Sequence, residues 1–287
     1  MQFLSVLVEG EQHIVTPRGA DLVSVTALLG DVPTDMAAFI ATPDVVARTT
    51  AALAHVTAAA VLPAAKVAYL PVVPRPGKVL CLGLNYKDHA AEVGLAIPDY
   101  PVVFMRGPTS LTGHRQPLLV PRLSPQLDYE AELAVVIGKH AHHVKAADAH
   151  AHVFGVTCFN DASLRDLQFR TSQWTAGKNF DRTGGLGPAI VTLDELPRDP
   201  DALAIATRLN GETVQQSNTA QHVFGVKEAV EVLSLLMTLE PGDIIALGTP
   251  SGVGMARTPP LWMKAGDTCD VEIEGIGVLS NPVAAEG

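Results

Sequence analysis

Positive charge is scarce in this sequence. Its 287 residues include 20 Lys and Arg against 30 Asp and Glu, which gives a formal net charge of −10. Nucleic acids and anionic membranes attract basic surfaces, and no cluster of Lys or Arg reverses the balance locally. The sequence therefore argues against a nucleic-acid partner and against a membrane partner.

Cysteine is also rare, and Cys81, Cys158 and Cys269 each lie in an apolar, strand-like run. An odd number without close pairing predicts reduced core thiols rather than a disulfide framework. No apolar run approaches the roughly 18 residues of a membrane-spanning helix. Residues 1–9 lack the basic start and the cleavage site of a leader peptide. We therefore expect a cytoplasmic protein.

Aromatic residues are few, at 5%, whereas apolar residues reach 47%, so Ala and Val fill much of a sizeable core.

In the N-terminal third, strand-like residues 3–8 and 13–15 flank Glu9 and Gly10, which predicts a hairpin. Residues 34–60 show helical spacing with an interruption at Pro43. None of residues 1–70 has a catalytic pattern.

A proline-rich stretch divides the chain. Residues 62–77 contain four prolines and are expected to be extended. Such stretches commonly separate domains. The sequence predicts a small accessory domain at residues 1–72 and a larger catalytic domain at residues 73–287.

The larger part is organised around residues 127–139. The second half of this stretch is β-branched and apolar and ends at Gly138, which predicts a strand. Alternate side chains share one face of a strand, which places Asp128, Glu130 and Glu132 together, about 6.6 Å apart along the backbone. Burying such carboxylates costs several kcal/mol per uncompensated ion. We expect positive charge between them, and a divalent cation is the simplest candidate.

The chain contains its own control for this pattern. Asp270, Glu272 and Glu274 have the same spacing. On spacing alone, each run is more often a solvated strand face than a metal site. Only the first run is followed by a second apolar strand, residues 152–161, that ends in an acidic residue, Asp161.

A candidate acid–base pair follows the buried strand predicted at residues 78–84. If the chain turns helical after Asn85, His89 and Glu92 are neighbours three residues apart on one face. A carboxylate that holds an imidazole fixes its tautomer and raises its basicity, as a general base requires. From spacing alone, an exposed His–Glu pair at a helix start is the commoner explanation.

A series of motifs runs along the second part of the chain: 83–92 (GLNYKDHAAE), 127–133 (LDYEAEL) with 136–139 (VIGK), 159–161 (FND) with 165–168 (RDLQ), 177–181 (GKNFD) with 187–188 (GP), and 241–252 (PGDIIALGTPSG). In these motifs and in their order, the sequence resembles the fumarylacetoacetate hydrolase family over about residues 74–283. The N-terminal unit is similar to the small leading domain of bacterial members. The resemblance implies a homodimer.

The resemblance also implies which acidic run binds metal. Glu130, Glu132 and Asp161 match the family's ligands for Mg²⁺ or Mn²⁺, so the first run is favoured over the second. Ligands that are all oxygen suit such a hard cation. Asp128 is not a consistent ligand in the family and is left out of the site.

Catalytic and substrate-binding roles are implied in the same way. His89 and Glu92 match the family's catalytic histidine and its partner on a lid, and Lys178 matches the active-site lysine. The positions that match substrate contacts or lie near the site are Arg165, Gln168 and Thr249.

These roles imply hydrolysis of a C–C bond in a 2-oxo acid such as an acylpyruvate, fumarylpyruvate or fumarylacetoacetate, as in aromatic catabolism. Water activated by His89 and Glu92 would attack the distal carbonyl, and the metal with Lys178 would hold the charge of the departing enolate. Decarboxylation, isomerisation, hydration or dehydration of a related 2-oxo acid remains an alternative. A noncatalytic metal-binding protein is a third hypothesis.

Two arginines depart from the family pattern near the pocket. Arg106 stands where a lysine is expected. Residues 182–186, which begin with Arg182, replace the Thr and the following proline-containing loop that many members have after the position of Asp181. Both arginines are candidates to bind the second carboxylate of a dicarboxylic substrate.

The implied fold is α+β and dominated by strands, with a mixed β-roll or β-sandwich catalytic domain and a small N-terminal α+β domain. Regular helix is expected mainly at residues 162–169 and 226–237. The histidines at 140–152 resemble a transition-metal cluster but more commonly mark an exposed connection. The glycines at 252–254 lack the order of a dinucleotide-binding loop.

Overall fold

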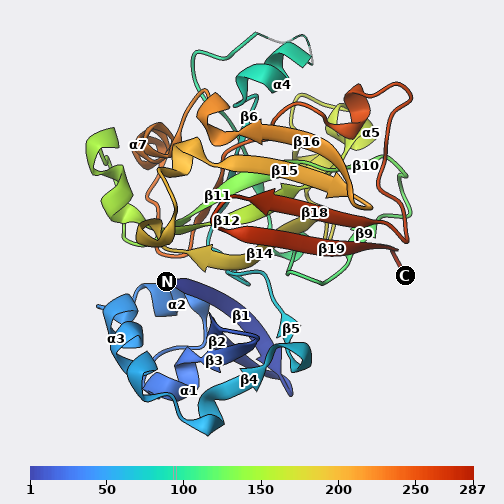
Figure 1. Ribbon diagram of the computed structural model, residues 1–287. Coiled ribbons are helices and arrows are strands. Elements are labelled where there is room, and N and C mark those ends of the chain that lie inside the picture. The colour runs from blue at the N-terminus through green and yellow to red at the C-terminus, as the bar shows by residue number, and fades with distance from the viewer. Residues whose placement is uncertain (93, 95) are drawn as a thin grey trace.

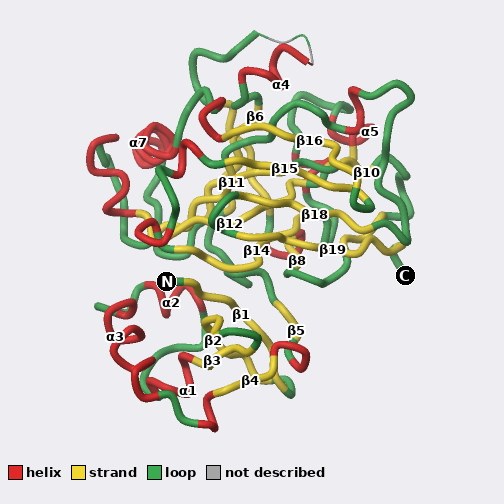
Figure 2. Tube along the Cα trace, in the orientation of Figure 1, coloured by secondary structure: helices red, strands yellow, loops and turns green. Residues whose placement is uncertain are grey.

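The computed structural model describes residues 1–92, 94 and 96–287. Strands form the centre of the molecule, and helices lie around them (Figure 2). A small N-terminal unit, blue in Figure 1, lies against a larger strand-rich body. The predicted strand-dominated α+β fold is confirmed.

The N-terminal unit is a small antiparallel sheet with helices beside it. Its elements are β1 (Gln2–Val8), β2 (Glu11–Arg18), β3 (Asp21–Ser24), α1 (Val25–Leu29), α2 (Met36–Ile40), α3 (Val45–Ala52), β4 (Val61–Pro63) and β5 (Ala68–Tyr69). The predicted hairpin is confirmed: β1 pairs with β2, and Glu9 and Gly10 between them have φ of 52° and 88°. Such positive φ values are what a two-residue hairpin turn requires.

The larger body contains the remaining elements. Its strands are β6 (Val79–Gly83), β7 (Val102–Arg106), β8 (Leu111–Thr112), β9 (Leu118–Val120), β10 (Leu127–Asp128), β11 (Ala131–Ile137), β12 (Val153–Asp161), β13 (Ser163–Leu164), β14 (Gly184–Val191), β15 (Ala204–Leu209), β16 (Glu212–Asn218), β17 (Ile244–Ala246), β18 (Thr268–Ile273) and β19 (Gly277–Ala285). Its α-helices are α4 (Lys87–Glu92), α5 (Arg165–Gln168), α6 (Thr175–Lys178) and α7 (Val226–Leu236).

Two sheets enclose the main core. The large mixed sheet runs in the order β4-β3-β2-β1-β14-β12-β11-β17-β6-β7, with β5 beside β1 and β8 beside β14. The second sheet runs β16-β15-β18-β19-β9, and β10 pairs separately with β13. Apolar side chains of both sheets meet in one buried cluster, which includes Leu133, Val135, Ile205 and Val271. This layered packing is the predicted sandwich.

Strand β11 lies at the centre of the large sheet, and all seven of its residues are buried. Leu133 and Val135 belong to the core shared with the second sheet, whereas Ala134 and Val136 belong to the cluster that includes Phe39 of the N-terminal unit. Successive side chains of a strand point to opposite faces, so a strand covered on both faces needs a continuous apolar run. The carboxylates at its start are therefore held by a rigid, buried element.

The N-terminal unit continues the large sheet. Strand β1 pairs with β14, with Gln2 opposite Val191 and Phe3 opposite Ile190. Backbone pairing thus joins the two parts, and the domain boundary at residue 72 stays a prediction.

The two predicted helices differ in outcome. Helix α7 at Val226–Leu236 agrees with the prediction of 226–237 within one residue. The helix predicted at 162–169 was too long: only Arg165–Gln168 is helical, because Ser163 and Leu164 pair with β10. All three cysteines are buried and free, as expected. Within the described residues, no helix is long and apolar enough to cross a membrane.

Candidate metal centre and active site

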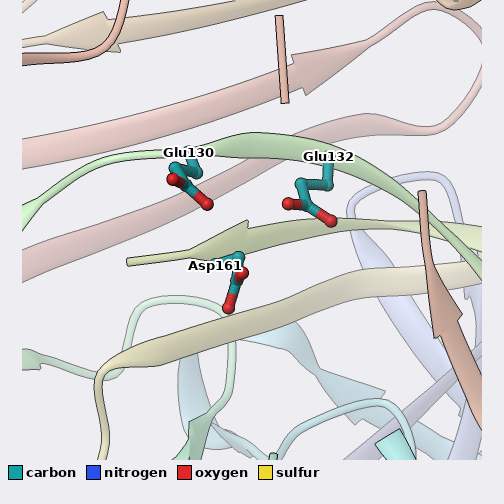
Figure 3. A group of neighbouring side chains, drawn as sticks. All are labelled: Glu130, Glu132 and Asp161. Carbon is teal, nitrogen blue, oxygen red and sulfur yellow. The ribbon is translucent and has the colours of Figure 1, made fainter. Parts of the chain in front are cut away.

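The three predicted metal ligands come together in the structure. Glu130 immediately precedes β11, Glu132 lies within it, and Asp161 ends the neighbouring strand β12. The backbone N–H of Asp161 donates to the carbonyl of Glu130 over 2.9 Å, which fixes the register. One carboxylate oxygen from each residue lies within 4.8 Å of the others. Figure 3 shows Glu130 and Glu132 extending from one ribbon toward the neighbouring ribbon that carries Asp161.

The second acidic run has no such arrangement. On β18, Glu272 pairs with Arg208, and Glu274 pairs with Arg198 beyond the strand's end. Both glutamates are partly exposed, whereas those of the first run are at most 5% exposed. Over the described residues, Glu130, Glu132 and Asp161 are the one acidic, His or Cys group with metal-ligand proximity.

Lys178 supplies much of the positive charge that the sequence predicted between the carboxylates. This buried side chain lies at the end of α6, and its Nζ donates to Glu130 Oε2 over 2.7 Å and to Asp161 Oδ2. A longer bond of 3.3 Å reaches the Asp161 carbonyl. All three ammonium protons thus have acceptors, and the ammonium stands between two of the three acidic groups.

Two buried arginines complete the charge network. Arg165 Nη1 pairs with Glu130 Oε1 over 2.7 Å, and its Nε donates to Asp128 Oδ2 over 2.8 Å. Arg106 Nη1 donates to Asp161 Oδ1. Asp128 also accepts the backbone N–H of Gly254 over 2.7 Å, so it holds a loop rather than joining the three ligands.

The electrostatics of the three ligands differ. Burial alone would raise the pKa of Glu130, but Lys178 and Arg165 outweigh it and hold this pKa at about 2. Burial, assisted by the charges of Asp161 and Glu130, raises the pKa of Glu132 well above its ordinary value. Its Oε2 accepts the Gly248 N–H over 2.9 Å, and among the described salt bridges it has no cationic partner.

This donor set fits a hard divalent cation. Three carboxylates converge in a buried place, and the charge of Glu132 is not neutralised by a side chain of the described protein. Mg²⁺ and Mn²⁺ prefer oxygen ligands of this kind. The neighbouring cations already pair with the other two carboxylates, so Glu132 is the ligand whose charge most needs a metal ion.

His89 and Glu92 form the predicted contact. Both lie on α4, which stands at the end of the molecule far from the N-terminal unit (Figure 1). His89 Nδ1 and Glu92 Oε2 are 3.1 Å apart, and Glu92 Oε1 accepts the Gly252 N–H over 2.8 Å. Partial burial would raise the pKa of Glu92, but its bonds to His89 and Gly252 lower it below the ordinary value. The lid implied by the resemblance continues through Val93 and Leu95, which lie outside the described residues.

A cavity of about 250 Å³ connects these groups. His89, the three candidate metal ligands and Lys178 all line it, as do Arg165, Gln168 and Thr249. Another part of its lining is apolar and was not predicted as a site: Leu82, Gly83, Leu84, Phe104, Phe169, Trp174 and Met255. Gly83 and Leu84 belong to the motif at 83–92, whereas the other five belong to none of the motifs named above. For Trp174, its nearness to Lys178 in the chain was the available signal.

The two arginines outside the family pattern do not line the cavity. Arg106 is directed at Asp161, and it also donates to Ser110 over 3.2 Å and to Thr183 over 2.8 Å. Arg182 lies in the turn before β14, with its backbone bonded to Thr109. Their role in binding a second carboxylate stays a prediction, and the geometry gives Arg106 a different task, which is to orient Asp161.

The fold and the site define the class of the protein. A strand-rich α+β body, a buried acidic triad and a lysine-lined cavity are combined with a family match described as Fumarylacetoacetate (FAA) hydrolase C-terminal over residues 78–284. The chain belongs to the fumarylacetoacetate hydrolase family and is an enzyme of that family.

Particular relatives narrow the comparison. The chain is 42% identical over 274 residues to the human mitochondrial oxaloacetate tautomerase FAHD2A, covering 93% of this chain and 85% of that protein. It is 45% identical over 215 residues to the oxaloacetate tautomerase YisK of Bacillus subtilis, covering 74% and 71%.

Solved structures agree in fold over the whole chain. Fumarylacetoacetate hydrolase from Exiguobacterium antarcticum superposes with a TM-score of 0.85 at 34% identity, covering 100% of both chains. Maleylpyruvate hydrolase from Sphingobium sp. SYK-6, in complex with manganese(II) and pyruvate, superposes with a TM-score of 0.83 at 27% identity and the same coverage.

Proposed function

We propose that this chain is a divalent-cation-dependent tautomerase of small 2-oxo acids, with oxaloacetate as the first substrate to test. The observation that carries the proposal is the convergence of the acidic triad, Lys178 and His89 on one cavity. The names of the relatives with 42% and 45% identity support the choice of reaction. Mg²⁺ or Mn²⁺ is the proposed cofactor, and a homodimer remains the expected assembly.

Keto–enol exchange needs a proton to leave or join C3 while another joins or leaves the 2-oxo oxygen. A divalent cation held by Glu130, Glu132 and Asp161 would supply Lewis acidity to the 2-oxo group. His89 lines the same cavity and is the group that can exchange a proton, and Glu92 fixes the orientation of its ring.

Lys178 has a different task. Its three protons are directed at acceptors in Glu130 and Asp161, so it has no lone pair with which to take a proton. Its ammonium charge lies beside the acidic triad, where negative charge develops on the substrate oxygen. In a partly dry pocket such a fixed charge is most effective. Gln168 and Thr249 are proposed to contact the substrate from the same lining.

The test is the rate at which purified protein equilibrates the keto and enol forms of oxaloacetate, followed by enol absorbance with Mg²⁺ or Mn²⁺. We expect acceleration that a chelator abolishes and that Glu132→Gln reduces at a fixed low concentration of the ion. Glu272→Gln, the matched change in the second acidic run, should behave as wild type. Wild-type protein that leaves the spontaneous rate unchanged with either ion would refute the proposal.

Hydrolysis of an acylpyruvate C–C bond is the second candidate, and the contact between His89 and Glu92 favours it because that pair can activate water. Acetylpyruvate or fumarylpyruvate in water enriched in ¹⁸O distinguishes the two reactions. A hydrolase places the label in the released carboxylic acid, whereas a tautomerase changes the enol absorbance without cleavage. Carbon dioxide release from oxaloacetate would identify decarboxylation instead.

A further inference from the structure

The residue before His89 makes contacts that the proposed reaction does not use. Asp88 Oδ2 accepts the hydroxyl of Ser217 over 3.1 Å and the hydroxyl of Ser251 over 3.3 Å. Its other oxygen, Oδ1, accepts the backbone N–H of His89 over 2.8 Å. One carboxylate therefore joins the backbone at His89 to two other segments of the chain.

Those segments belong to the body that holds the cavity. Ser217 lies in β16 of the second sheet. Ser251 lies two residues after Thr249, which lines the cavity. The hydroxyl donors thus come from two separate segments of the body, β16 and the loop after Thr249, and Asp88 accepts a hydrogen bond from each.

Asp88 and Glu92 are four residues apart, so they lie on the same face of α4. Glu92 binds the Gly252 N–H, and Asp88 binds the adjacent Ser251. His89 is held between these two attachments. A helix of six residues is not stable alone in water, so its placement depends on such contacts.

We propose that Asp88 is a positioning residue, which fixes α4 through Ser217 and Ser251 so that the His89 imidazole faces the cavity. The inference rests on the proposed function only in so far as His89 moves a proton there. Asp88 itself does not line the cavity. It acts on the reaction through the orientation of its neighbour.

A purely local role for Asp88 is the alternative. A carboxylate in the first turn of a helix accepts an orphan N–H and is favoured by the helix dipole. The two serines separate these roles, because Ser217→Ala with Ser251→Ala removes the attachments and leaves the bond to the His89 N–H intact. The local role predicts that this double variant behaves as wild type.

The decisive experiment compares Asp88→Ala, Asp88→Asn and the double serine variant, with the metal ion saturating. We expect kcat to fall roughly 10- to 100-fold in Asp88→Ala, because displacement of a reacting group by about 1 Å has effects of that size. The double serine variant should show a similar loss, Asp88→Asn a smaller one, and KM should change little. Asp99→Ala, which removes an exposed carboxylate further along the same connection, controls for the change in charge.

Two further measurements distinguish a failure of the positioning role of Asp88 from a failure of the proposed function. On the residual rate of His89→Ala, adding Asp88→Ala should cause no further loss, because both changes remove the same contribution; an equal loss in both backgrounds overturns the proposal. Hydrogen exchange at residues 87–92 should become faster in Asp88→Ala and in the double serine variant. Hydrogen exchange needs no substrate. Unchanged exchange in these variants would therefore refute the proposal that Asp88 fixes α4, even if the wild type turns over no 2-oxo acid.

Discussion

At the scale of single residues, Glu132 is the least compensated of the buried carboxylates. Asp128, Glu130 and Asp161 are each bonded to an arginine or lysine, whereas Glu132 accepts one backbone N–H. An ion pair that is broken in the interior is strongly destabilising, and an uncompensated charge has the same problem. The protein therefore holds a strained acidic group at the place where a metal ion would relieve it.

We predict that Glu132→Gln has opposite effects on stability with and without metal. Without Mg²⁺ or Mn²⁺ the variant should melt at a higher temperature than wild type, by an amount equivalent to about 1 kcal/mol, because the neutral amide is less costly to bury. With Mn²⁺ the order should reverse, since the affinity of such a site for a divalent cation depends on the number of its charged ligands and the variant has one fewer. Melting curves with and without the ion measure both, and Glu272→Gln should show neither effect.

The indole ring of Trp174 lies so close to Gly83 that it leaves no space for a side chain at that position. A Cβ at this position would lie 2.1 Å from Trp174 Cζ3. Trp174 packs edge-to-face against Phe104 with centroids 5.5 Å apart, and the Phe104 ring lies 5.0 Å from Lys178 Nζ. Any side chain at residue 83 must therefore displace the apolar wall of the cavity.

We predict that Gly83→Ala raises KM roughly tenfold while the protein stays folded, because the Trp174 ring moves into or away from the substrate space. Intrinsic fluorescence reports the movement, since the chain has only 2 tryptophans. Gly107→Ala is the matched control: its Cβ would meet only Asn179 Oδ1 at 3.6 Å, an ordinary contact. Equal kinetics for both variants would contradict this account.

At the scale of secondary-structure elements, the sequence predicted the strands that carry the site but not the partners of each charge. The apolar runs at 127–139 and 152–161, each with acidic residues at one end, were sufficient to place Glu132 and Asp161 on strands. The pairing of Arg106 with Asp161 was out of reach, because it follows from strands that are distant in the chain. The helix predicted at 162–169 was too long for a similar reason: residues 163–164 pair with β10, so α5 begins only at Arg165.

Helix α7 depends on a cap from outside the helix. Its N-cap residue, Gly225, has no side chain, and both oxygens of Asp201 accept the Val226 N–H, over 3.1 and 3.0 Å. A carboxylate there satisfies an orphan donor and favours the positive end of the helix dipole.

We predict that Asp201→Ala lowers the free energy of unfolding by about 1–2 kcal/mol, as the loss of an N-cap does. Asp201→Asn should recover most of it, since an amide oxygen also accepts a hydrogen bond. Glu228→Gln removes an exposed carboxylate of the same first turn without touching the cap and should cost only a few tenths of a kcal/mol. Urea unfolding provides the comparison, and equal losses in Asp201→Ala and Glu228→Gln would exclude the cap.

At the scale of the whole molecule, the N-terminal unit and the C-terminal strand meet around His114. Its ring contacts Tyr69 of β5 edge-on with centroids 4.9 Å apart, and its Nδ1 accepts the backbone N–H of Ser280 in β19 over 3.1 Å. The sequence indicated a division near residue 72, but it could not show that Tyr69 and Ser280, which are far apart in the chain, both contact the His114 ring. These contacts depend on the pairing of β1 with β14 and on the course of the chain after β8.

This imidazole makes the stability of the molecule depend on pH. Burial, with the charge of Arg115, lowers the pKa of His114 to about 4 from an ordinary value of 6.5. The unfolded chain therefore binds the proton more readily between pH 6.5 and 4, so the contribution of neutral His114 is fully present above pH 6.5 and is lost as the pH falls toward 4. Protonation at Nδ1 would also abolish the acceptor for Ser280.

We predict that His114→Asn removes part of this pH dependence. Between pH 7 and pH 4.5 wild type should lose on the order of 1–2 kcal/mol more than the variant, a figure that allows for the partial exposure of the ring. Denaturant midpoints across that range measure the difference, and a His55→Asn variant controls for an exposed histidine elsewhere. Parallel curves for wild type and His114→Asn would contradict this prediction. The loss of stability at acidic pH would then have to come from the titration of another group.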